Sequence, residues 1–137
     1  MAEMINLEAF LNPVELENEH IAISDRFKDK EGKPIKWEIR PLSQEENMTL
    51  IKRFTKRKKN GAEHFDQVGY GQALVCTAVV YPDLDNSKLQ KAYGVLGKEQ
   101  LINKMLTIGE FANLSLAVRN LSGLDDDIND VIEEVKN

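Results

Sequence analysis

The stretch IKWEIRPLSQEE, residues 35–46, changes its hydrophobic period part-way along and decides the fold class. Ile35, Trp37 and Ile39 alternate with charged residues, which is the period of a strand with one buried and one wet face. Residues 43–46 then have the form of a helical capping box, in which a Ser hydroxyl and a Glu carboxylate each satisfy a free backbone N–H. The sequence therefore predicts a strand followed at once by a helix, in an α+β fold.

A partner for this strand lies upstream. Ile21 and Ile23 alternate with smaller or polar residues, and residues 29–34 supply turn chemistry. We expect an N-terminal β-hairpin over residues 19–42. A two-stranded hairpin is marginal alone, so this one must pack on helices or pair with another chain.

Residues 1–18 form an N-terminal segment ahead of the hairpin. Residues 6–12 predict a short helical turn that stops before Pro13, with Leu7, Phe10 and Leu11 on one side. Acidic residues occupy the positions where a secretory signal is basic, and no apolar core of a signal follows. We expect a protein of the cytoplasm.

Five or six short-to-medium helices are expected over residues 43–137. The first runs to about Lys58, with Met48, Ile51 and Phe54 inward, and the second covers about residues 66–80, apolar nearly all round and deeply buried. Further helices are expected at residues 87–94 with Ser87 as the cap, at 98–106, at 107–122 behind a second capping box, and at about 126–136. The chain is thus expected to be one domain, residues 1–137, mainly helical, with the hairpin packed on its helices.

Charge is segregated along the chain. The net charge of −5 resolves into −6 over residues 1–25, +7 over 26–59, −1 over 60–124 and −5 over 125–137. The acidic ends can therefore contact the basic middle, within one chain or between copies. A single cysteine fits a reducing compartment, and the most apolar run, residues 74–81, is too short to span a bilayer.

Catalytic and metal chemistry is poorly supported. Cys76 lies in the most apolar segment, where a thiolate is disfavoured, so a buried structural role is expected. Two acidic clusters, residues 83–94 and 125–136, begin like calcium loops but lack the turn glycine and the final bidentate glutamate, and helix capping explains them more simply. Gly69 and Gly71 lack the context of a phosphate loop and predict close helix packing. We expect no enzyme, no cofactor and no metal.

Two surfaces are candidates for binding a partner. The first is a basic run that complements the helix dipole or binds an acidic protein or nucleic acid. The second is an apolar stripe near the C-terminus that packs on the chain's own core or docks into a groove of a partner or a second copy. Their residues are Lys52, Arg53, Lys56, Arg57, Lys58 and Lys59 for the run, and Leu121, Leu124, Ile128, Val131, Ile132 and Val135 for the stripe.

Three stretches together resemble a known family. They are RFKDKEGKPIKWEIRPLS (residues 26–43), CTAVVYPDL (76–84) with LQ and YGV shortly after it (89–95), and MLTIGEF (105–111). In this order and spacing they are similar to the XkdN-like tail assembly chaperones of contractile-tailed phages and Bacillus-type defective prophages. The similarity runs from about Leu7 to the end of the chain.

The resemblance implies a non-enzymatic, protein-binding role. Such chaperones bind the tape-measure protein before the tail tube polymerises around it, and they are absent from the mature particle. Relatives come in short and frameshift-extended forms, and a homo-oligomer is compatible with the pattern. No membrane contact is implied. The alternative function left open by the residues is a small nucleic-acid-binding factor that uses Lys52 to Lys59.

Overall fold

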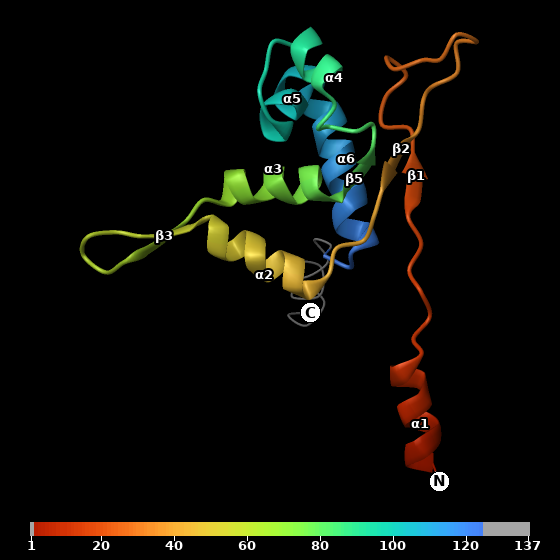
Figure 1. Cartoon of the computed structure of the whole chain (residues 1–137), viewed down its shortest axis with the longest axis vertical. Helices are drawn as coiled ribbons and strands as arrows, with labels where there is room; N and C mark the ends of the chain where they lie inside the picture. Colours follow the sequence, from red (N-terminus) through yellow and green to blue (C-terminus); the bar gives the residue numbers. More distant parts are fainter. Residues whose placement is uncertain (1, 125–137) are drawn as a thin grey trace, which may run out of the picture.

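The computed structural model describes residues 2–124 and, from residue 6 onward, their side chains (Figure 1). Helices predominate, and the strands are short. The elements in chain order are α1 (Ala2–Leu11), β1 (Glu19–Ile21), β2 (Trp37–Ile39), α2 (Gln44–Arg53), β3 (Thr55–Arg57), β4 (Glu63–Phe65), α3 (Gln67–Ala78), β5 (Val79–Tyr81), α4 (Ser87–Ala92), α5 (Lys98–Met105) and α6 (Ile108–Leu121). The α+β, mainly helical fold with an N-terminal hairpin is confirmed.

The predicted hairpin is the first part of a three-stranded antiparallel sheet with the order β1-β2-β5. Ile21 lies opposite Trp37 in the β1–β2 pair, and Ile39 lies opposite Val79 in the β2–β5 pair. Trp37 and Ile39 are 2% and 0% exposed, so β2, the central strand, is anchored in the core. The hairpin is therefore packed within its own chain, on the third strand β5 and on the helices.

The turn between β1 and β2 also forms as predicted. The carboxylate of Asp29 accepts hydrogen bonds from the backbone N–H groups of Glu31 and Lys33, at 2.9 and 3.0 Å. Gly32 adopts a φ of +84°, which a residue with a side chain reaches only with strain. A bridge between Lys28 and Pro34 closes the loop.

Helix α2 starts at the predicted capping box and ends earlier than predicted. Ser43 accepts from the backbone of Glu46, and the Glu46 carboxylate accepts from the backbone of Ser43. The helix stops at Arg53, and residues 55–57 form β3, which pairs with β4. Continuing the helix to residue 58 would place like charges four residues apart, which is unfavourable. The hairpin instead brings Arg57 within 3.7 Å of Glu63.

The inward face of α2 agrees with the prediction for Ile51 and Phe54, which pack against the core, and differs from it for Met48. Leu50 is its buried residue, whereas Met48 is 41% exposed, and Ile51 and Phe54 are half-buried. Leu50, Ile51 and Phe54 therefore attach α2 and its C-terminal cap to the core, and Met48 faces solvent.

Three further boundaries differ from the prediction. The helix expected to reach residue 80 ends at Ala78, and residues 79–81 form β5, since two valines and a tyrosine suit a strand when the exposed edge of β2 is available. The cap of α4 is Asn86, whose side chain accepts from the backbone of Leu89, and not Ser87. The N-terminal helix is longer than expected and begins at Ala2.

The core lies between the sheet and α3, α5 and α6. Burial of the α3 segment from Ala73 to Cys76 is confirmed, and so is the capping box of Thr107 and Glu110 at the start of α6. The largest fully buried side chains are Trp37, Ile39, Val75, Leu101, Ile102, Leu114 and Val118. None of the helices in the described residues is long and apolar enough to cross a membrane.

Candidate functional site

Cys76 is the first candidate for chemistry, and its surroundings keep it inert. The side chain is 2% exposed inside α3. Burial raises the pKa of the Cys76 thiol to about 12, with a smaller contribution from the charge of Glu99. A thiol with such a pKa stays protonated at neutral pH and is a poor nucleophile.

The acidic cluster of residues 83–87 is used for local structure. The carboxylate of Asp83 accepts from the backbone of Asp85, Asp85 lies 3.2 Å from Lys98, and Asn86 caps α4. Within residues 2–124, no group of three or more His, Cys, Asp or Glu side chains lies close enough to hold a metal ion. The second acidic cluster, residues 125–136, falls outside the described residues.

Glu110 is the buried carboxylate of the described chain, at 7% exposed, and its bonds are structural. Arg26 donates to both of its oxygens, at 2.6 and 2.8 Å, and also to the backbone oxygen of Met105. The bonds from Arg26, followed by those from Ser24 and Thr107, hold the pKa of Glu110 well below its usual range. This carboxylate therefore stays charged and joins the loop after β1 to the α5–α6 junction, a link that no local sequence pattern announces.

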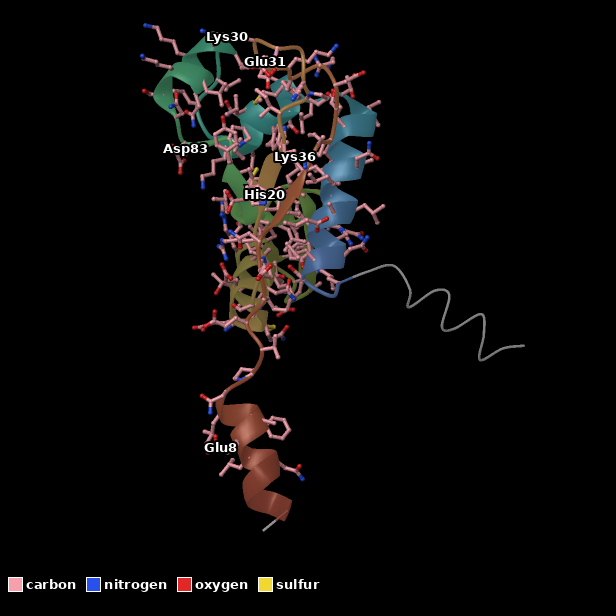
Figure 2. The ribbon with its side chains drawn as sticks, turned by 90° about the vertical axis from the view of Figure 1, so that its right-hand side faces the viewer. Glu8, His20, Lys30, Glu31, Lys36 and Asp83 are labelled. Atoms are coloured by element: carbon pink, nitrogen blue, oxygen red, sulfur yellow. The ribbon has the colours of Figure 1, made fainter. Side chains whose placement is uncertain are left out.

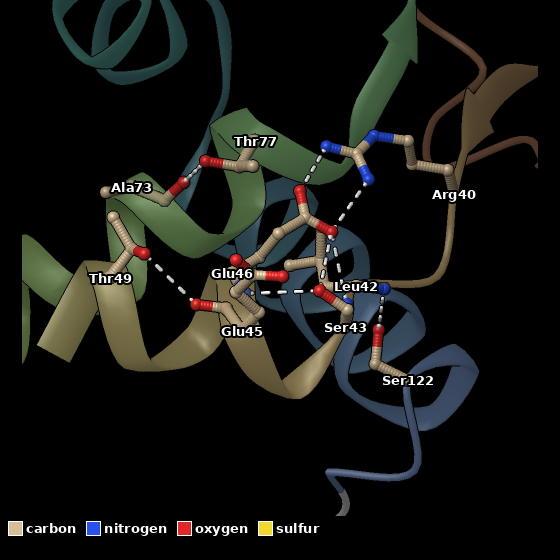
Figure 3. A network of polar contacts seen from close by, with 9 residues as sticks. All are labelled: Arg40, Leu42, Ser43, Glu45, Glu46, Thr49, Ala73, Thr77 and Ser122. Atoms are coloured by element: carbon tan, nitrogen blue, oxygen red, sulfur yellow. Dashed lines mark hydrogen bonds and ion pairs between the residues drawn. The ribbon is translucent and has the colours of Figure 1, made fainter.

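A cavity of about 280 Å³ lies where α6 ends against the start of α2. Figure 3 shows the polar contacts around this junction: the backbone N–H of Leu42 donates to the Ser122 hydroxyl at 2.9 Å, and Arg40 forms two bonds to Glu46 beside the cap of α2. The lining residues are Leu42, Ser43, Gln44, Asn47, Leu74, Val118, Arg119, Ser122, Gly123 and Leu124. The lining thus combines buried apolar residues, Leu74 and Val118, with polar residues such as Gln44 and Arg119.

The predicted apolar stripe begins at this cavity. Leu124 lines it and is 37% exposed, whereas Leu121 is half-buried and packs against the core. The remaining stripe residues, Ile128, Val131, Ile132 and Val135, lie outside the described residues. Whether the stripe binds a partner stays a prediction.

The basic run lies at the other end of α2 from the cavity. Lys52 and Arg53 end the helix, Lys56 and Arg57 lie on β3, and Lys58 and Lys59 follow in the turn of the β3–β4 hairpin. Figure 1 shows this hairpin projecting away from the body of the molecule. The prediction of one continuous basic helix was wrong, because the run is divided between a helix end and a ribbon. Of the apolar stripe, the two described residues, Leu121 and Leu124, lie at the opposite end of α2 from the basic run.

The N-terminal segment is a further exposed surface. Leu7, Phe10 and Leu11, predicted to share one side of a helical turn, are 55%, 82% and 62% exposed. Figures 1 and 2 show α1 standing clear of the rest of the fold at the end of an extended connection. Val14 and Leu16 on that connection are 93% and 73% exposed.

Comparison with known proteins decides the family. The model for the phage XkdN-like tail assembly chaperone proteins matches residues 7–136. This chain belongs to that family. The match includes the cavity, the projecting hairpin and the second half of α1 with Leu7, Phe10 and Leu11, so all three surfaces contribute to the family's domain.

Individual relatives agree with this assignment. The tail assembly chaperone domain is 28% identical over 129 residues to the phage-like element PBSX protein XkdN of Bacillus subtilis strain 168, covering 90% of this chain and 87% of XkdN. It is 27% identical over 129 residues to YqbN of the same strain, with the same coverage. The crystal structure of YqbN superposes with a TM-score of 0.73 at 22% identity, over 85% of this chain and 96% of that one, which shows a shared fold.

Proposed function

We propose that this tail assembly chaperone binds the tape-measure protein before the tail tube polymerises around it. The observation that carries the proposal is the family match over residues 7–136. The role is non-catalytic, is performed in the cytoplasm of the bacterial host, and ends before the particle is mature. A frameshift-extended form of the chain belongs to the same proposal.

The cavity at the end of α6 is the surface we assign to the tape-measure protein. Its accessible apolar lining residues, Leu42 and Leu124, suit the apolar side chains of a helix laid across it. Gln44 and Asn47 on the rim offer hydrogen bonds to polar groups of that helix. The cavity volume of about 280 Å³ lies at or below the lower end of the ~300–1,000 Å³ typical of small-molecule sites, which favours side chains as its contents.

Co-expression with the tape-measure protein of the same prophage tests this function. We expect the two proteins to co-purify and the tape-measure protein to become more soluble. Absence of both effects would contradict the proposed function.

A matched pair of variants tests the surface. Leu124→Asp places a charge at the cavity mouth and is expected to lower the yield of co-purified tape-measure protein at least fivefold. Leu96→Asp changes a side chain that is 86% exposed and absent from the cavity lining, and is expected to leave the yield unchanged. Equal yields from the two variants would show that the tape-measure protein binds a different surface, and they would not contradict the proposed function.

The nucleic-acid alternative is favoured by the projecting hairpin, on which Lys56, Lys58 and Lys59 are exposed. It predicts binding that weakens steeply with salt. Titration of labelled DNA and RNA at low ionic strength, with no shift at any protein concentration, would remove it.

A further inference from the structure

We propose that this protein self-associates, with the N-terminal arm of one copy docked on the basic β3–β4 hairpin of a second copy. The N-terminal arm is α1 together with the extended residues 12–18. This contact is separate from tape-measure binding and uses neither the cavity nor the apolar stripe.

The arm needs a cover that the described part of its own chain does not provide. Leu7, Phe10 and Leu11 lie at positions i, i+3 and i+4 of α1 and form an apolar face of this helix that is open to solvent. A helix of 10 residues is shorter than the ~12–15 residues at which an isolated helix becomes even marginally stable in water. Burial of this apolar face of α1 against another surface supplies the stability that the isolated helix lacks.

The charge of the arm selects the surface that covers it. Glu8, Glu15 and Glu17 are exposed on the arm, within a segment of net charge −6 that contains no Lys or Arg. The basic run is the complementary region, and its lysines 56, 58 and 59 are exposed on or beside the hairpin. Among the described residues, the ion pairs of the run involve only Arg53 and Arg57, with Glu99 and Glu63. The hairpin therefore presents positive charge that no described neighbour balances.

The base of the hairpin also offers apolar contacts for the apolar face of α1. Phe65 on β4 is 40% exposed, and Val68 in the first turn of α3 is 73% exposed. Phe65 packs on Tyr70 with ring centroids 5.3 Å apart, which fixes its position at the base of the hairpin. Apolar burial there supplies affinity, and the surrounding charges supply specificity and a dependence on salt.

The geometry points to a second copy as the occupant. The arm and the hairpin leave the body in different directions, and each is fixed at its base, the arm by the pairing of β1 with β2 and the hairpin by α2 and α3 (Figures 1 and 2). Two copies that exchange arms reciprocally satisfy both surfaces twice, in a closed two-fold arrangement.

Light scattering on the full chain over a range of concentrations tests the proposal. We expect a dimer at low salt and a measurable shift toward monomer at about 0.5 M NaCl, where charges more than ~4 Å apart are screened. Phe10→Asp, at an exposed site, is expected to weaken association at least tenfold. Ile108→Asp, at a side chain 93% exposed on the body, is the matched control and is expected to associate normally. A monomer at every concentration, or an undiminished dimer in Phe10→Asp, would overturn the proposal.

Charge exchange identifies the two surfaces. Reversing the arm (Glu8→Lys, Glu15→Lys, Glu17→Lys) or the hairpin (Lys56→Glu, Lys58→Glu, Lys59→Glu) is expected to weaken association, and both sets in one chain are expected to restore it. Failure of the double set to recover would sink the pairing. Ile132→Asp in the full chain separates the other acidic segment: loss of association in that variant, with Phe10→Asp unaffected, would assign the hairpin to residues 125–137 instead. Hairpin reversal that abolishes nucleic-acid binding and leaves the dimer intact would also contradict the contact.

Discussion

At the scale of single residues, Gly69 and Gly71 lie two residues apart in α3 and have different surroundings. Two glycines in a helical pattern predicted close packing, and this is confirmed at Gly69 only. A Cβ at Gly69 would lie 2.7 Å from a ring carbon of Phe54 and 2.5 Å from the Asp66 carboxylate, whereas nothing lies within 4 Å of one at Gly71. The composition of α3 predicts that a neighbour comes close, but which glycine it approaches depends on Phe54, which leaves α2 in a direction the sequence did not reveal.

Gly69→Ala and Gly71→Ala should therefore change the free energy of unfolding in opposite directions. The added methyl group at Gly69 displaces the Phe54 ring and disturbs the Asp66 cap, which we expect to lower the free energy of unfolding by about 1–3 kcal/mol. At Gly71 the methyl group meets no neighbour, and alanine's higher helix propensity should raise the free energy of unfolding by about 0.5–1 kcal/mol. Urea denaturation of both variants measures the difference. Equal effects would mean that Phe54 yields freely.

At the scale of elements, helix starts were more predictable than helix ends. Both capping boxes were found from local spacing, because the Ser or Thr hydroxyl and the Glu carboxylate act within four residues of each other. The end of α2 and the strand character of residues 79–81 depend on pairing with distant segments, β4 and β2. Residues 55–57 and 79–81 are compatible with either state, so tertiary pairing decides them.

The α2 capping box carries a pH dependence. The Arg40 guanidinium, with help from the Ser43 backbone, lowers the pKa of Glu46 from 4.5 to about 2. A carboxyl with a lowered pKa stabilises the fold above its unfolded pKa and loses that contribution as the pH falls from about 4.5 toward 2. Glu46→Gln should therefore cost about 1–2 kcal/mol at pH 7 and flatten the stability profile in that acid window.

Thermal unfolding at several pH values checks this. Glu45→Gln, one residue earlier at an exposed position of the same turn, is the control and should keep the acid-dependent profile. Glu110 also has a lowered pKa, so its contribution to the stability of the fold is also lost as the pH falls. The stability of Glu46→Gln is therefore expected to keep some dependence on pH in the acid range. A profile for Glu46→Gln as steep as that of the unaltered chain would contradict the role assigned to Arg40.

At the scale of the whole molecule, the binding surfaces were less predictable than the core. The burial of Cys76 followed from its apolar run alone. The cavity could not be anticipated, because Leu42 and Ser122 meet across 80 residues of chain. The basic run was found as a charge pattern, but its division between the end of α2 and the projecting hairpin appears only once β3 has paired with β4.

The reactivity of Cys76 reports on opening of the whole core. With a pKa of about 12 and 2% exposure, the thiol should react with a disulfide reagent at pH 8 at least ~1000-fold more slowly in the native chain than in denaturant. A cysteine introduced by Val80→Cys, at a position 42% exposed on the edge strand, should react at once. Rapid labelling of one thiol in the unaltered native chain would show that α3 opens locally.

The strand order β1-β2-β5 has a consequence for synthesis. The hairpin is complete by residue 39, but the strand that closes its other edge ends at residue 81, about 40 residues later. At translation rates of ~5–20 residues per second, this interval lasts roughly 2–8 s. Throughout it, Trp37 and Ile39 lack the strand and the helices that bury them in the complete fold. A protein proposed to bind a partner chain before assembly is thus itself made with its central strand ahead of the elements that bury it.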